Sequence, residues 1–201
     1  MIEPPAPTAS KPVRTFVAVF PPPEIRAAAI ARARETVRRL GDRVRWIKPE
    51  NVHLTLKFLG DVREEALGNL CAPLGEICAR HAPFDVGLVG LGAFPSARRA
   101  RILWVGVGAG SDQLRALAAD LDAAFASSGF EHEKRSYAPH VTLGRVRGRP
   151  ASFDLPSDAG DHLGFRVRRV ELVESTLAPE GAVYGTVRAF ALGEKKLENE
   201  P

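Results

Sequence analysis

The chain has 201 residues, of which 45% are hydrophobic, and its formal net charge at pH 7 is +4. That length suits one large domain or two small lobes that share a core, and the hydrophobic fraction is normal for a globular protein. No apolar run reaches the roughly 18 residues that a transmembrane helix requires, so we expect no membrane partner.

Both ends of the chain are predicted to lie outside the folded part. Residues 1–12 are rich in proline and lack the cationic start and apolar stretch of a signal peptide, which favours a disordered tail and a cytoplasmic protein. We expect a single bilobal domain over residues 13–192 and a flexible C-terminal tail over residues 193–201.

Arginine supplies most of the positive charge, and it is clustered at residues 38–39, 98–101, 145–149 and 166–169. Clustering favours a local site for an anionic ligand over a uniformly positive surface. For any single cluster, a solvated arginine-rich surface is an equally good explanation.

The two cysteines, Cys71 and Cys78, fall in one predicted helix. At a rise of 1.5 Å per residue, seven positions separate them by about 10.5 Å along the axis. A disulfide needs Cα atoms within about 7 Å of each other. We therefore expect two buried free thiols, as in a reducing cytosol.

Short strands alternate with helices along the chain. Runs of β-branched and aromatic residues bounded by proline or glycine indicate strands, and apolar positions at helical spacing indicate helices. In chain order we expect a strand at residues 13–20, a helix at 24–40, strands at 44–47 and 53–59, a helix at 63–80, strands at 84–91 and 101–107, a helix between 111 and 129, a strand at 140–146, a polar loop at 148–164, and strands at 165–175 and 184–192. Pro73 should kink or split the second helix, and Ser111 should cap the third.

Two of the predicted strands carry the same His-x-Thr motif, His53 with Thr55 and His140 with Thr142. Because side chains alternate along a strand, each motif presents an imidazole and a hydroxyl to one surface and apolar neighbours to the other. One such histidine alone is more often structural, but two copies in matched contexts indicate a site. If the two motif strands faced each other, they would supply two proton-transfer groups and two hydrogen-bond donors. These groups are sufficient to cleave a phosphate ester without a metal.

The two motifs also end two similar strand–helix–strand units. Their histidines are 140 − 53 = 87 positions apart. Two similar lobes packed about a pseudo-two-fold axis would bring the two motif strands together at the centre of the molecule.

Five segments resemble the 2H phosphoesterase superfamily, and within it the RNA 2′,3′-cyclic phosphodiesterases formerly described as 2′-5′ RNA ligases. They are residues 14–19; residues 44–60, which contain the first motif; residues 92–95 with 101–107; residues 137–145, which contain the second motif; and residues 173–177 with Gly181 and Tyr184. A lone His-x-Thr would mean little, but matches in order along nearly the whole chain are specific.

The resemblance implies an α+β fold of two similar lobes, each an antiparallel sheet with helices on the outside, around a central catalytic cleft with pseudo-two-fold symmetry. It implies hydrolysis of a terminal 2′,3′-cyclic phosphate to a 2′-phosphomonoester. It also implies that the catalytic set is His53, Thr55, His140 and Thr142.

Four further residues are candidates for substrate binding. The resemblance implies that Arg145 binds the phosphate, and Tyr184 matches the family pattern although a structural role suits it equally. Alternation puts Lys57 on the same face as Thr55, where it would border the cleft. Phe58 suits either stacking on a base or packing in the core.

Histidine suits both proton-transfer roles because its unperturbed pKa is near 6.5. One imidazole must be neutral to take a proton from the attacking water, and the other must be protonated to donate to the leaving O3′. The near symmetry of the motifs leaves the assignment open, with a slight preference for His140 as base and His53 as acid. The threonine hydroxyls would stabilise the charge that develops on the non-bridging oxygens.

We expect no metal and no cofactor, because His-x-Thr lacks a third ligand at a usual spacing and the chain has no glycine-rich phosphate loop. The expected partner is RNA with a 2′,3′-cyclic phosphate end, tRNA fragments included, and the expected state is a monomer. Three alternatives stay open: 2′-5′ RNA ligation by the same residues, cleavage of linear 2′-5′-linked oligonucleotides, and a non-enzymatic module that binds cyclic phosphate ends.

Overall fold

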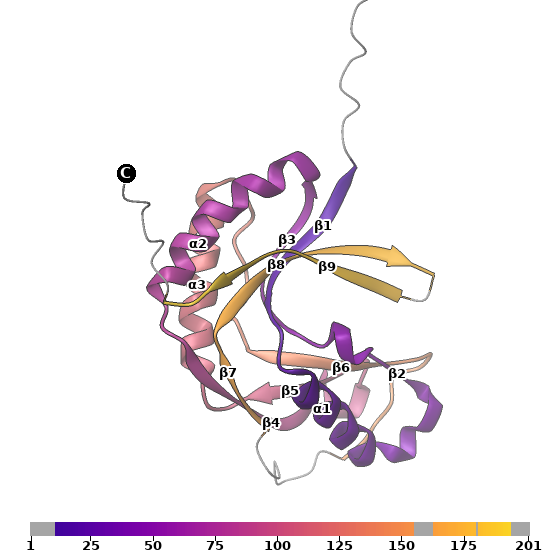
Figure 1. Cartoon of the computed structure of the whole chain (residues 1–201). Coiled ribbons are helices and arrows are strands. Elements are labelled where there is room, and N and C mark those ends of the chain that lie inside the picture. Colours follow the sequence, from indigo (N-terminus) through magenta and orange to yellow (C-terminus); the bar gives the residue numbers. More distant parts are fainter. Residues whose placement is uncertain (1–10, 155–162, 180, 194–201) are drawn as a thin grey trace, which may run out of the picture.

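The computed structural model describes residues 11–154, 163–179 and 181–193, which form one antiparallel sheet with helices packed on it (Figure 1). The strands are β1 (Pro12–Val19), β2 (Val44–Trp46), β3 (Leu54–Arg63), β4 (Phe84–Phe94), β5 (Ile102–Val107), β6 (His140–Val146), β7 (Leu163–Val167), β8 (Arg169–Ala178) and β9 (Gly181–Ala191). The α-helices are α1 (Pro23–Thr36), α2 (Cys71–Arg80) and α3 (Ser111–Ser127), and the 3₁₀ segments are η1 (Arg38–Arg43), η2 (Pro49–Asn51), η3 (Glu64–Leu70) and η4 (Ala97–Arg99).

The sheet is strongly curled and runs in the order β7-β4-β5-β6-β3-β1-β8-β9, with β2 paired to β6 (Figure 1). It has two halves, which meet where β3 pairs with β6. Counted outward from that junction, β6, β5, β4 and β7 in one half correspond to β3, β1, β8 and β9 in the other. The predicted pair of similar lobes is therefore confirmed, and the two lobes are halves of one continuous sheet.

The two longest helices each cross from one half of the sheet to the other. Helix α1 follows β1 but contacts β6 and β7, whereas α3 follows β5 but contacts β3. Each half thus buries apolar surface against a helix that follows a strand of the other half. This exchange ties the two halves into one structure.

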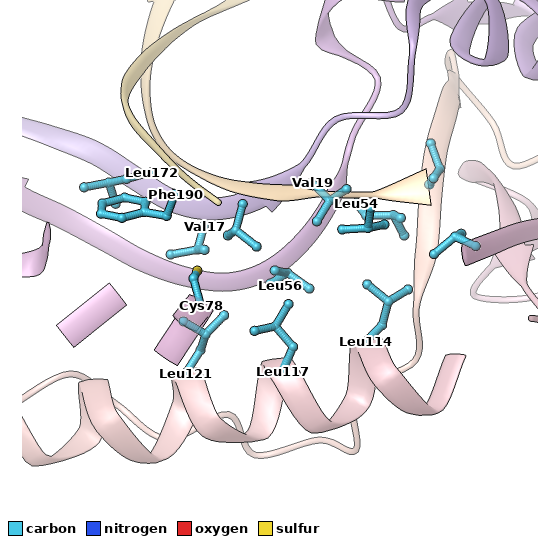
Figure 2. Close-up of a cluster of buried hydrophobic side chains, with 14 of the residues drawn as sticks. Val17, Val19, Leu54, Leu56, Cys78, Leu114, Leu117, Leu121, Leu172 and Phe190 are labelled. Carbon is cyan, nitrogen blue, oxygen red and sulfur yellow. The ribbon is translucent and has the colours of Figure 1, made fainter. Parts of the chain in front are cut away.

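The main core lies between α3 and the sheet (Figure 2). Leu114, Leu117 and Leu121 fall at helical spacing on one face of α3, and they point toward Leu54 and Leu56 of β3. All five side chains are buried. Burial of each such side chain contributes roughly 1.5–3 kcal/mol to the stability of the fold. This layer therefore holds α3 against the surface of β3 that carries Leu54 and Leu56.

Both cysteines are free thiols, as predicted, but only Cys78 is fully buried and Cys71 is partly exposed. Cys78 points into the same core layer from α2 (Figure 2). Its burial raises the pKa of the thiol to about 12, so the thiolate that would react is disfavoured near neutral pH.

The predicted helix at residues 63–80 is divided into η3 and α2, as the position of Pro73 suggested. Pro73 lies in the first turn of α2, where its missing N–H breaks no helical hydrogen bond. The cap prediction for the third helix is wrong. Ser111 is its first residue, and Gly110 precedes it with φ 78°. Glycine is required there because an added Cβ would lie 2.4 Å from the backbone oxygen of Asp85.

The strand predicted at residues 165–175 is two strands, separated at Arg168. Strand β7 pairs with β4 and β8 pairs with β1, so the chain passes between the two halves at this point. The predicted tails lie outside the described residues except for Lys11, Pro12 and Gly193, and Pro12 already belongs to β1. None of the described helices is long and apolar enough to cross a membrane.

One ion pair is buried between β3 and α3. Lys57 is 6% exposed, and its Nζ donates to Asp122 Oδ1 at 2.6 Å and to the backbone oxygen of Glu131 at 2.7 Å. Burial raises the pKa of the Asp122 carboxyl, but hydrogen bonds from Lys57, His132 and the backbone N–H of Glu133 outweigh it and hold the pKa well below its usual value. The pair anchors α3 to β3.

Asp122→Ala should lower the free energy of unfolding by about 3 kcal/mol, because it leaves the Lys57 ammonium buried without its partner. The double variant Lys57→Met/Asp122→Leu should recover most of that loss, since no charge then remains buried. Urea denaturation at pH 7 measures both, and a single variant as stable as the parent would contradict the account. Because the pKa of Asp122 is lower folded than unfolded, its contribution is present near pH 7 and disappears as pH falls through the folded pKa.

Candidate active site

The site forms at the junction of the two sheet halves. There β3 and β6 pair antiparallel with Leu54 opposite Val141. Both side chains are 0% exposed and lie in the main core. Because side chains alternate along a strand, the residues on either side of each point to the opposite surface of the sheet.

The neighbours of this pair are the four residues of the two motifs. Continued by one position each way, the register places His53 opposite Thr142 and Thr55 opposite His140. Two imidazoles and two hydroxyls thus share one surface, with each histidine across from the threonine of the other motif. We call this surface the histidine face.

Each of the two imidazoles is held by an equivalent hydrogen bond to the backbone. His53 Nδ1 lies 2.7 Å from the backbone oxygen of Asn51, and His140 Nδ1 lies 2.8 Å from that of Ala138, each two residues upstream. A carbonyl oxygen only accepts, so Nδ1 carries the proton in both rings. Nε2 is therefore the nitrogen that each ring has left for proton transfer.

Aromatic rings surround His53. Phe16 of β1 stacks on it with ring centroids 4.9 Å apart, Tyr184 of β9 meets it edge-on at 5.2 Å, and Phe20 lies at 5.5 Å. These contacts limit the ring orientation and exclude water from its faces.

His140 also has aromatic neighbours, but it has two where His53 has three. Phe94 meets it edge-on at 5.2 Å, and the Trp104 ring lies at 6.0 Å. Trp104 lies over Gly92 in the paired strand, where an added Cβ would come within 2.2 Å of the indole. Only glycine leaves room for that indole, so Gly92 helps to place the ring beside His140.

The pKa of His53 is lowered from its ordinary value. Burial is the largest cause, the hydrogen bond to the Asn51 carbonyl opposes it, and the charge of His140 lowers the pKa further. The repulsion means that a proton on one ring disfavours a proton on the other. In the free protein this favours the neutral form of His53.

An extra residue in β3 interrupts the alternation just after the first motif. Thr55 pairs with Ala18, but Lys57 pairs with Val17, so Leu56 forms a β-bulge. The bulge turns the residues that follow to the opposite surface.

The structure therefore does not bring Lys57 to the histidine face as alternation predicted. Lys57 points to α3, where it forms the buried ion pair. Phe58 takes the place on the histidine face instead. It is 58% exposed, and its ring lies 6.3 Å from that of Phe16.

Strand β6 carries the equivalent bulge, at Leu143. Thr142 pairs with Trp104, whereas Gly144 pairs with Leu103, so Leu143 is the extra residue. The two bulges occupy the same position relative to the two motifs. The pseudo-two-fold relation thus extends to an irregularity of the backbone.

The second bulge turns Arg145 to the histidine face. Without it, Arg145 would point away from Thr142, because the two are an odd number of positions apart. Burial raises the pKa of the Tyr184 phenol, while the charges of Arg145 and Arg14 lower it, so both guanidinium groups act on the surroundings of Tyr184. Tyr184 in turn contacts His53.

Sequence reasoning missed Arg14, Asn51 and Tyr137 as parts of the site. Arg14 shares a face with Phe16 by simple alternation, which was a usable signal. Asn51 also donates from Nδ2 to the backbone oxygen of Ala182 at 2.7 Å, which ties β9 to the segment that holds His53. Tyr137 donates its hydroxyl to the backbone oxygen of Thr55 at 2.8 Å, which ties the two motifs together.

The other described histidines pair with carboxylates away from this face, His81 with Asp120 and His132 with Asp122. Among the described residues, no group of three or more histidine, cysteine, aspartate or glutamate side chains is arranged to hold a metal ion.

Comparison with known proteins identifies the class that this fold and face define. A family model described as LigT like Phosphoesterase matches residues 19–104 and 105–184. Each matched segment contains one His-x-Thr motif, and each includes strands from both halves of the sheet. The chain belongs to the LigT-like phosphoesterase family of the 2H superfamily.

Individual relatives agree with the family assignment. A Thermus thermophilus protein named RNA 2′,3′-cyclic phosphodiesterase is 37% identical over 189 residues, covering 90% of each chain. The Aeropyrum pernix protein of the same name is 36% identical over 163 residues, 79% of this chain and 92% of its own. The crystal structure of E. coli LigT in apo form has a TM-score of 0.76 and 29% identity, covering 92% of this chain and 100% of that one.

The lowered pKa of His53 can be tested by following its imidazole protons in an NMR titration. His53 should titrate below 6.5, and His140→Gln should raise its pKa toward that value because it removes the repulsion between the rings. His132→Gln is the matched control and should leave His53 unchanged. An identical His53 pKa with and without His140 would mean that the rings are not coupled.

Proposed function

We propose that the protein hydrolyses the 2′,3′-cyclic phosphate end of RNA to a 2′-phosphomonoester by metal-independent acid–base catalysis with His53 and His140. One observation carries the proposal: two imidazoles on one face, each with Nδ1 bound to a carbonyl and Nε2 left for substrate. The relatives named RNA 2′,3′-cyclic phosphodiesterase support this substrate. A crystal structure of E. coli LigT complexed with phosphate supports phosphate as the group bound; it has 28% identity and a TM-score of 0.74, and the match covers 92% of this chain and 100% of that one.

The reaction requires one proton to be taken up and one to be given. Water attacks phosphorus and transfers a proton to the neutral Nε2 of one histidine. The bond from phosphorus to O3′ breaks, and the protonated Nε2 of the other histidine donates to that oxygen. The 2′-phosphate is the product, and the two rings have exchanged roles, so a proton shift through solvent restores the starting state.

The remaining groups of the histidine face suit a phosphate. The Thr55 and Thr142 hydroxyls can donate to the non-bridging oxygens, where charge grows in the transition state. Arg145 adds a permanent positive charge, since a guanidinium stays protonated in proteins. We assign Phe58 and Tyr184 to the ribose and base, because one is an exposed ring and the other carries a hydroxyl beside His53.

Either His53→Ala or His140→Ala should lower the rate of nucleoside 2′,3′-cyclic phosphate hydrolysis by roughly 10²–10⁴-fold, because each removes one proton-transfer group. The parent should release the 2′-monophosphate equally fast with and without EDTA, and His132→Ala should match the parent. Near-parental rates in either active-site variant, or loss of activity with EDTA, would overturn the mechanism.

The same assay separates the alternatives. Added RNA with a 5′-hydroxyl end tests ligation, a linear 2′-5′-linked dinucleotide tests cleavage of that linkage, and tight binding without turnover would indicate a binding module.

A phosphodiester with a p-nitrophenolate leaving group distinguishes acid from base. That leaving group departs without a proton, so the variant that lacks only the general acid should keep most of its activity. The sequence-based preference predicts that His53→Ala keeps it and His140→Ala loses it. The reverse result would make His53 the base, the role that its lowered pKa favours in the free protein.

The rate of hydrolysis should show a bell-shaped dependence on pH, because one ring must be neutral and the other protonated. The acid limb of kcat/KM should lie below pH 6.5, since burial and His140 lower the pKa of His53. The His140→Gln variant cannot be used for this measurement because it lacks a catalytic group. The midpoint of the acid limb is therefore compared with the pKa of His53 from the NMR titration of the parent. An acid limb above 6.5 would contradict the lowered pKa.

A further inference from the structure

A row of four arginines extends from the histidine face along β2 and β6. In this ladder Arg45 lies opposite Arg145. The backbone N–H of Arg147 donates to the backbone oxygen of Arg43 at 2.7 Å, which continues the pairing by two residues and places these two opposite each other. All four side chains are exposed. We call them the arginine row.

The arginine row lies on one surface of the sheet. The residues between its members, Val44 and Val146, pack on the opposite surface, in a second core cluster with Leu103. Since Arg145 shares the histidine face with Thr142, alternation puts Arg147 on that face as well. The row therefore leads away from the proposed phosphate position along the paired strands β2 and β6.

Most of the positive charge of the row is not neutralised by the protein. Among the described residues, no carboxylate lies within salt-bridge range of Arg43, Arg145 or Arg147. Arg43 is oriented by a neutral group, since its Nη2 donates to the backbone oxygen of Arg149 at 2.7 Å. Like charges at opposite positions of a ladder repel each other, so an anion bound between them would lower the energy of this arrangement.

The spacing of the row suits a chain of anions rather than a single one. Positions two residues apart on one strand lie about 6.6 Å apart, which is on the order of the separation of consecutive phosphates in an extended polynucleotide. Beginning at Arg145, the row reaches one further position, to Arg43 and Arg147. It can therefore meet one or two phosphates beyond the one at the histidines.

We propose that the arginine row binds the backbone phosphates of the nucleotides that precede the cyclic end, so that an RNA chain is a better substrate than a free cyclic nucleotide. This inference rests on the proposed function for the identity of the reacting end. It adds that recognition extends upstream of the reacting phosphate and is electrostatic, hence independent of base sequence.

Kinetics with substrates of increasing length test the proposal. At low salt, kcat/KM should be higher for an RNA octamer ending in a 2′,3′-cyclic phosphate than for a nucleoside 2′,3′-cyclic phosphate. The double variant Arg43→Gln/Arg147→Gln should raise KM for the octamer roughly tenfold and leave the kinetics of the nucleoside substrate unchanged. Arg115→Gln, on the exposed side of α3, is the matched control and should behave as the parent with both substrates.

Binding measured without turnover separates this proposal from the proposed function. Fluorescence anisotropy with a labelled RNA octamer carrying a 2′-phosphate end gives the affinity as a function of salt. The double variant should show a slope of log affinity against log salt that is shallower by about 0.7 if its two arginines neutralise one phosphate, and by about 1.4 if they neutralise two. An unchanged slope and affinity would overturn the role of the row, even if the cyclic phosphate is hydrolysed. Absence of hydrolysis with the expected binding would instead overturn the proposed function.

Discussion

The short ladder between β3 and β6 is the constraint on which the rest of the site depends. It joins the two halves of the sheet, and its central pair, Leu54 and Val141, is completely buried in the main core. A slip of one residue in either strand would expose one of these side chains and turn an imidazole into the core. The apolar side of the junction therefore sets the register that brings the polar groups together on the other side. The same strand pairing thus determines both the packing of the core and the arrangement of the catalytic groups.

The backbone repeats in the two halves, but the side chains do not. Each motif has the same hydrogen bond to the ring and the same bulge directly after its threonine, yet the bulges deliver Phe58 on one side and Arg145 on the other. His53 is also packed by three aromatic rings, whereas His140 lies beside Phe94 and Trp104. Two equivalent imidazoles thereby acquire different surroundings, which is what a reaction with one acid and one base needs.

Sequence patterns predicted most of the elements and the four residues of the motifs, because alternation and helical spacing report which side of an element is buried. They failed where the direction of a side chain or the end of a strand depends on pairing with distant segments rather than on the local sequence. The bulge at Leu56 reversed the expected direction of Lys57, and the passage of the chain between halves at Arg168 divided one predicted strand into two. Asn51 escaped notice because part of its role, the bond to His53, is made by a backbone oxygen, which any residue type supplies.

The central claim is that both imidazoles act on one phosphate. A crystal structure of the protein with a nucleoside 2′-phosphate tests it most directly. We expect a single phosphate within hydrogen-bond distance of Nε2 of His53 and Nε2 of His140, with the Thr55 and Thr142 hydroxyls donating to its oxygens. A phosphate bound to one histidine alone, or bound elsewhere with both Nε2 atoms facing solvent, would contradict it.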